Sequence, residues 1–157
     1  LSGLVSGRVA VRGLVDDPEG GATAGGGEIL IQDGTLFRLP LLGGLSSLLS
    51  MIYPGFGFAS QTDFHSDFAI RDRSVVMDDA RLEGDILSVR AAGKYEFHGK
   101  MRFVVEVQLL RRGPVAALVR LVTLPVTKLL EFQLSGTLEE PKWRPVNLPK
   151  ELFLIFE

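Results

Sequence analysis

Asp63, His65 and Asp67 recur at every second position, and these are the side chains of the sequence best spaced to do chemistry. If their segment is a strand, alternate side chains share one face, so an imidazole and two carboxylates could reach a metal ion. The chain has one other histidine, His98, which also falls on a polar strand pattern. A solvated strand face of mixed charge explains the same spacing, and we predict no metal and no cofactor.

The sequence offers few residues for any other kind of catalysis. Ser46, Ser47 and Ser50 form an uncharged stripe with no base beside it, whereas a catalytic triad needs a base oriented by a third group. Cysteine is absent, which excludes a cysteine nucleophile. The sequence has a single tryptophan, so it lacks the aromatic-rich cleft expected of a glycosidase. The glycines 25–27 lack the Lys-Ser/Thr ending of a phosphate loop. We predict that the protein is not an enzyme, and its net charge of −2 argues against nucleic acid as a partner.

The segment from Lys94 to Leu109 alternates apolar and polar residues, except that Val104 is apolar at a polar position. This period of two predicts one strand about 50 Å long with one apolar face. Gly99 alone interrupts that face and predicts a bend or bulge. The apolar face comprises Tyr95, Phe97, Met101, Phe103, Val105, Val107 and Leu109.

Shorter alternating segments surround this one and predict adjacent antiparallel strands. Asp33-Gly34 is a typical hairpin turn, and Asp72-Arg73 turns the chain again. Phe64, Phe68 and Ile70 share one strand face. The predicted strands are 4–14, 28–32, 35–38, 62–71, 74–82, 86–92 and 132–138, with 16–27 a flexible connector and 143–149 an extended coil.

Two segments carry helical periodicity. The first begins at Pro40 and places Leu45, Leu48, Leu49 and Ile52 on one face, opposite a polar stripe without charge. Because a solvated helix normally carries charge there, we expect this helix to lie against protein or lipid. The second runs from Gly113 to about Leu130, is apolar over most of its circumference and includes Leu118, Leu121 and Val122.

We therefore predict a mainly β fold, a curved and twisted antiparallel sheet forming a groove and capped by two amphipathic helices. Residues 1–145 form this domain and 146–157 a tail or edge segment. The sequence contains no uninterrupted apolar run long enough for a membrane span. Two interpretations stay open: the helices complete a closed core, or they leave an apolar groove for acyl chains. In the second case the lipid-binding residues are Phe64, Phe68, Ile70, Tyr95, Phe97, Met101, Phe103, Val105, Val107, Leu109, Leu45, Leu48, Leu49, Ile52, Leu118, Leu121 and Val122.

The order of these motifs resembles the AsmA-like C-terminal domain. Residues 27–36 and the helix that follows resemble the opening of that domain. Residues 64–72, 82–87 and 92–97 resemble its middle. Its close is similar to 125–130 and 132–138 with Pro141 and Trp143.

That resemblance implies a piece of a large envelope protein of diderm bacteria, related to TamB and YhdP. Such a protein is anchored in the inner membrane by an upstream helix, extends through the periplasm as a β-groove and takes part in phospholipid transport to the outer membrane. The resemblance brings no catalytic residues. The alternative function is a structural scaffold with a closed core, which docks envelope partners.

Overall fold

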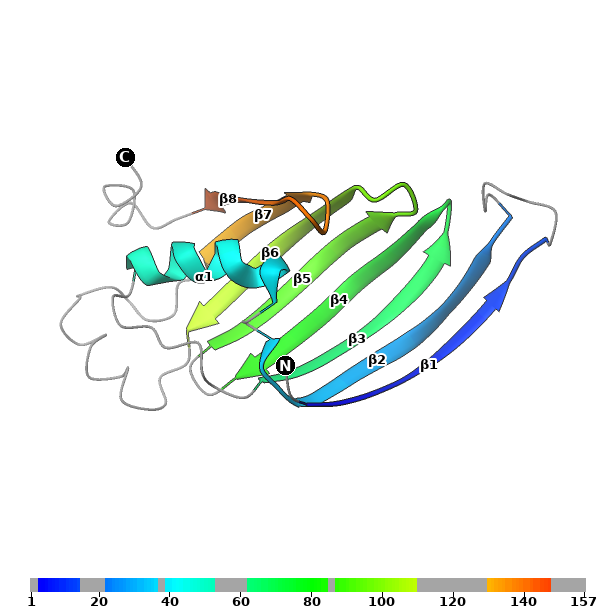
Figure 1. Cartoon of the computed structure of the whole chain (residues 1–157), viewed down its shortest axis with the longest axis horizontal. Coiled ribbons are helices and arrows are strands. Elements are labelled where there is room, and N and C mark those ends of the chain that lie inside the picture. The colour runs from blue at the N-terminus through cyan, green and yellow to red at the C-terminus, as the bar shows by residue number, and fades with distance from the viewer. Residues whose placement is uncertain are drawn as a thin grey trace.

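A single antiparallel sheet makes up most of the computed structural model, which describes residues 3–14, 22–36, 39–52, 62–84, 87–109 and 130–147. Within these residues its eight strands pair strictly in chain order, each with the next (Figure 1). The helix α1 (Pro40–Ile52) lies across one face of this sheet (Figure 1). The strands are β1 (Leu4–Arg12), β2 (Ala24–Gly34), β3 (Thr62–Arg71), β4 (Ser74–Gly84), β5 (Leu87–Glu96), β6 (Met101–Leu109), β7 (Leu130–Gly136) and β8 (Pro141–Asn147). The predicted mainly β, antiparallel fold is confirmed.

The predicted single strand from Lys94 to Leu109 is wrong. The chain turns back at residues 97–100, so that β5 and β6 form a hairpin in which Tyr95 pairs with Met101. Gly99 allows the reversal because its φ of 96° is a left-handed conformation that side chains disfavour. The amide nitrogens of Glu96 and Gly99 close the turn on the carbonyl oxygens of Lys100 and Glu96, at 2.7 and 2.8 Å. Phe97 is consequently 44% exposed in the turn and does not lie on the inner face.

The hairpin predicted at Asp33-Gly34 is also wrong, although Asp33 does adopt a positive φ of 53°. The left-handed residue lies at an irregularity between β2 and β3, and the chain continues into α1. The glycines predicted in a connector belong to β2 instead. A side chain on Gly27 would meet the ring of Phe68 at 2.8 Å from Cζ, so glycine makes room for that ring across the strand pair.

A bulge in β4 changes which residues face α1. Asp78 and Asp79 together oppose Ala92 of β5, since the register passes from Met77–Gly93 to Ala80–Ala91. The extra residue moves the inner side chains from odd to even positions, so Met77 and Ala80 lie on the same face. The Asp72-Arg73 turn that precedes β4 is confirmed, with positive φ at both residues as a two-residue hairpin requires.

The last two strands differ from the predictions. β7 begins at Leu130, which the sequence pattern assigns to the second helix, and Pro141–Asn147 is the strand β8 where a coil is predicted. Alternation does not reveal β8 because Pro141 and Pro145 occupy its inner positions, which an edge strand tolerates. The second helix otherwise falls on residues outside the described part of the chain. The boundary after Pro145 falls within β8 and stays a prediction.

The core lies between α1 and the second half of the sheet. Pro40 starts the helix as predicted, and Leu45 and Leu49 are fully buried against the strands. Trp143 of β8 donates from Nε1 to the carbonyl oxygen of Leu41 at 2.8 Å. Among the residues that the structure describes, the other buried apolar ones are Leu36, Ala80, Leu82, Leu87, Val89, Met101, Val105, Val107, Leu130, Phe132 and Leu134.

Candidate functional site: an apolar cavity under the helix

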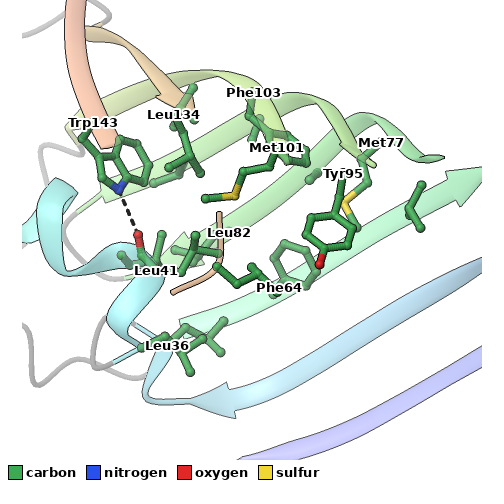
Figure 2. Close-up of a pocket in the computed structure, with 18 of the residues that line it drawn as sticks. Leu36, Leu41, Phe64, Met77, Leu82, Tyr95, Met101, Phe103, Leu134 and Trp143 are labelled. Atoms are coloured by element: carbon green, nitrogen blue, oxygen red, sulfur yellow. Dashed lines mark hydrogen bonds between the residues drawn. The ribbon is translucent and has the colours of Figure 1, made fainter. Parts of the chain in front are cut away.

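An apolar cavity of about 470 Å³ remains beside this core, between the start of α1 and the inner face of the sheet. Figure 2 shows Trp143 and Leu41 at one end and Tyr95 and Met77 at the other. Among the described residues, no charged side chain lines the cavity. The lining residues are Ile31, Leu36, Leu39, Leu41, Leu42, Phe64, Val75, Met77, Ala80, Leu82, Val89, Ala91, Tyr95, Met101, Phe103, Val105, Leu134, Leu138 and Trp143.

The cavity is large enough for an apolar molecule. It follows β5 from Val89 to Tyr95. At roughly 3.3 Å per residue, that part of the strand is about 20 Å long. The cavity volume lies in the range of about 300–1,000 Å³ typical of small-molecule sites. At the far end, Leu138 lines the cavity and is 46% exposed, so the cavity reaches the surface there.

Two glycines leave room for the helix and the aromatic rings around the cavity. A side chain on Gly44 would come within 2.5 Å of Trp143 Cδ1, so glycine lets α1 approach the indole closely. On β5, a side chain on Gly93 would meet Phe103 Cδ1 at 2.7 Å. Glycine at these positions therefore allows Trp143 and Phe103 to lie where they do on the wall of the cavity.

The structure separates the predicted lipid-binding residues into groups. Phe64, Tyr95, Met101, Phe103 and Val105 line the cavity. Val107, Leu45 and Leu49 are wholly buried and belong to the solid core, against which Leu48 packs. Phe68 and Ile70 are half-buried on β3 outside the cavity, and Phe97 is in the exposed turn. The side chains of Ile52 and Leu109, and all of Leu118, Leu121 and Val122, lie outside the described residues.

Several residues that line the cavity were not predicted from the sequence. Met77, Val75, Ala80 and Leu82 belong to one wall, but the bulge breaks their alternation. The phase change at Asp78-Asp79 was the available signal, since two carboxylates in the middle of an alternating strand are typical of a bulge on an exposed face. Trp143 was missed because its segment does not alternate like a strand.

The opposite, outer face of the sheet is charged. Arg81 and Arg90 stand directly opposite each other on β4 and β5, which is an unfavourable pairing of like charges. Asp79 at the bulge forms ion pairs with both guanidinium groups. The hydrogen bond from Arg81 is the main cause that lowers the pKa of Asp79 to about 2, and the bond from Arg90 adds to it against the desolvation that raises the pKa. The bulge therefore places a carboxylate where it bridges two arginines.

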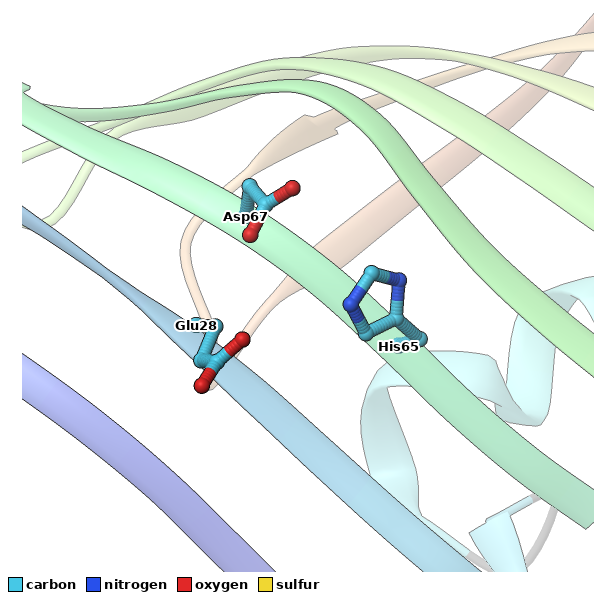
Figure 3. A group of neighbouring side chains, drawn as sticks. All are labelled: Glu28, His65 and Asp67. Carbon is cyan, nitrogen blue, oxygen red and sulfur yellow. The ribbon is translucent and has the colours of Figure 1, made fainter.

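The metal-ligating group considered above is only partly assembled. Asp63 accepts a hydrogen bond from the Asp33 amide at 2.9 Å, and Glu28 of β2 takes its place beside His65 and Asp67. Ligand atoms of these three residues lie within 4.8 Å of one another on the outer face (Figure 3). All three side chains are exposed, and three ligands fall short of the four of a structural zinc site. We assign no metal to this group.

Comparisons with family models, curated proteins and solved structures find no match for this chain. Within the described residues, no helix has the length and hydropathy of a membrane span. The cavity is therefore the feature from which a function can be argued.

Proposed function

We propose that this protein is a non-enzymatic lipid-handling domain that holds an acyl chain in the cavity between α1 and the sheet. The observation that carries this proposal is a hollow of about 470 Å³, whose described lining includes no charged side chain. Half of a bilayer's hydrocarbon core, the depth that one acyl chain spans, is about 15 Å. The length of the cavity along β5 accommodates such a chain.

The energetics favour a chain over a polar ligand. Burial contributes about 0.8 kcal/mol per CH₂ group, so several methylene groups give useful affinity without any hydrogen bond. The polar groups on the described wall offer little to a specific polar ligand. Trp143 already donates to Leu41, which leaves the Tyr95 hydroxyl. A site of this kind distinguishes ligands by length and shape of the apolar part.

The larger setting follows from the resemblance to AsmA-like domains. We propose that the chain is part of a periplasmic envelope protein of a diderm bacterium, anchored in the inner membrane by an upstream segment and handling phospholipid on its way to the outer membrane. An open sheet with an apolar inner face is compatible with that role. Envelope proteins are the expected protein partners.

Native mass spectrometry of the purified protein, followed by lipid extraction, tests the acyl-chain site. Ala91→Phe fills the cavity from β5, whereas Ala92→Phe adds the same ring to the exposed outer face of the same strand. We expect phospholipid or fatty acid to co-purify with the native chain and the Ala92 variant but not with the Ala91 variant. Protein free of lipid that also fails to take up added fatty acid would contradict the proposal.

A scaffold function is the second candidate, and the exposed strand β1 favours it. Among the described residues β1 pairs on one edge only, with β2, and all of its residues are exposed. An unpaired edge can accept a strand from another protein. Uptake of acyl chains by the native protein distinguishes the two candidates, because a scaffold with a closed core would take up none.

A further inference from the structure

A second hollow of about 350 Å³ lies at the rim of the sheet, where β6 begins. It lies between the β5–β6 turn, which contributes Lys100, and the β7–β8 turn, which contributes Thr137 and Glu140. Met101 and Arg102 both line it, although successive side chains point to opposite faces of a strand. Because Arg102, Ser135 and Lys142 lie in one cross-strand row on the outer face, the hollow opens on that face, and Met101 at the strand end is its link to the inner face.

Cations dominate the lining of this rim hollow. Lys94, Lys100, Arg102 and Lys142 face two carboxylates, Glu96 and Glu140. The register places Lys94 opposite Arg102, Arg102 opposite Ser135 and Ser135 opposite Lys142 on adjoining strands. Like charges therefore gather along one cross-strand row, where neighbouring side chains interact.

The carboxylates neutralise this cluster only in part. Glu96 binds Lys94 Nζ at 2.6 Å and also His98 Nε2 at 2.9 Å. The hydrogen bond from Lys94 is the main cause that lowers the pKa of Glu96. Within the described part of the chain, no ion pair joins a carboxylate to Lys100, Arg102 or Lys142. These cations are thus available to an anion in the hollow.

The rim hollow adjoins the open end of the apolar cavity. Met101 lines both, and the cavity residue Leu138 follows the hollow residue Thr137 in the same turn. Tyr95, which lines the cavity, lies between Lys94 and Glu96, which line the hollow. A chain that leaves the cavity beside Leu138 arrives next to the cations. An amphiphile that occupied both the cavity and the hollow would pass around the end of the sheet at Met101.

We infer that the cavity and the rim hollow form one site for an amphiphile with a negatively charged, phosphate-bearing headgroup. The acyl chain occupies the cavity, and the phosphate lies among Lys100, Arg102 and Lys142. Guanidinium and ammonium groups bind phosphate oxygens by charge-assisted hydrogen bonds. This inference rests on the acyl-chain function proposed above and adds selection by headgroup charge.

The test is calorimetric titration of delipidated protein with two lysophospholipids of equal chain length, one with the anionic phosphoglycerol headgroup and one with zwitterionic phosphocholine. The variant combines Arg102→Gln with Lys142→Gln. Arg144→Gln is the matched control, because Arg144 is exposed on the same strand as Lys142 and does not line the hollow. Inorganic phosphate alone is titrated as a third probe.

We expect the native protein and the Arg144 variant to prefer the phosphoglycerol lipid. The double variant should bind that lipid about tenfold more weakly, because it has lost two of the cations that attract an anionic headgroup. Phosphocholine lipid should lose less affinity in the double variant, because its choline cation offsets the charge of its phosphate. Equal affinity for both lipids in the native protein would overturn the inference and leave the acyl-chain function standing. Binding of inorganic phosphate as tight as that of the anionic lipid would also overturn it, and binding of neither lipid would overturn both proposals.

Discussion

The two halves of the sheet carry the same inner-face pattern but bury it to very different degrees. One cross-strand row passes through the paired strands β1 to β7 and is apolar throughout: Val5, Ile31, Phe64, Leu82, Val89, Val107 and Leu130. Val5 at one end is 68% exposed, whereas Val107 near the other end is completely buried. Strand alternation is equal at both ends, so it cannot be the cause of this difference.

Helix α1 makes the difference. It lies over the half of the sheet that ends in β8, where Trp143 holds it, and leaves β1 and its neighbours uncovered (Figure 1). The cavity lies at the transition between the two regions, with Leu41 and Leu42 on its helix side and Ile31 and Phe64 on its sheet side. The alternation of a strand shows which side chains share a face. The position of the helix determines which part of that face is buried in the core.

The largest effect that separates the two halves should come from matched leucine truncations. Leu49→Ala removes a wholly buried side chain from α1, and we expect it to lower the free energy of unfolding by about 2–5 kcal/mol. The matched position on β1 is Leu4, whose side chain is 66% exposed. Leu4→Ala should change the free energy of unfolding only within the small range of ordinary surface substitutions. Urea denaturation measures both, and similar losses in the two variants would show that burial by α1 does not distinguish the halves.

A smaller effect is expected from adjacent glycines of α1. A side chain on Gly43 would meet no atom within 4 Å, so Gly43→Ala should stabilise the helix by about 0.5–1 kcal/mol as the better helix former. Gly44→Ala would push against Trp143, and overpacking of this kind costs about 1–3 kcal/mol. Trp143 is the single tryptophan of the sequence, so its fluorescence reports directly on the contact. A gain in stability with unchanged emission for the Gly44 variant would contradict the close packing of α1 on β8.

The smallest effect concerns the outer face, where Asp79 bridges two arginines. Its folded-state pKa of about 2 lies below the ordinary 3.8, so the stabilisation is present above about pH 4 and is lost as the pH falls toward 2. Asp79→Asn should make unfolding less dependent on pH across that window. The loss at neutral pH should be small because the ion pairs are exposed. Thermal melts at several pH values measure this, with Asp78→Asn as the control; equal pH dependence in all three proteins would refute the bridge.

Local sequence information predicted the strands and the helix start, but pairing decided the rest. Alternation correctly marked β1, β3 and β4, and Pro40 marked the start of α1. The segment 94–109 kept its alternation through a reversal, because Tyr95 pairs with Met101 and the five residues between them, an odd number, return the chain in phase. A continuous pattern of period two therefore could not distinguish one long strand from a hairpin.

The residues of the candidate site could be predicted only where strand alternation showed which face a side chain occupies. Phe64, Tyr95, Met101, Phe103 and Val105 were named from alternation and do line the cavity. On α1, helical periodicity identified Leu45 and Leu49 as apolar but not the depth at which each one packs, and the cavity is lined by the preceding turn instead. The hollow itself depends on how far α1 stands from the sheet. Gly44 and Trp143 set that distance, and they are far apart in sequence.

The most direct measurement of the acyl-chain site uses a fatty acid that carries a spin label on its chain, added to protein with labelled methyl groups. Paramagnetic broadening should be strongest for Leu41, Met101 and Leu134, which line the cavity, and weak for Val9, which is exposed on β1. It should disappear in the Ala91→Phe variant and persist in Ala92→Phe. Broadening centred on the valines of β1, or equal broadening in both variants, would place the chain outside the cavity and contradict the proposed function.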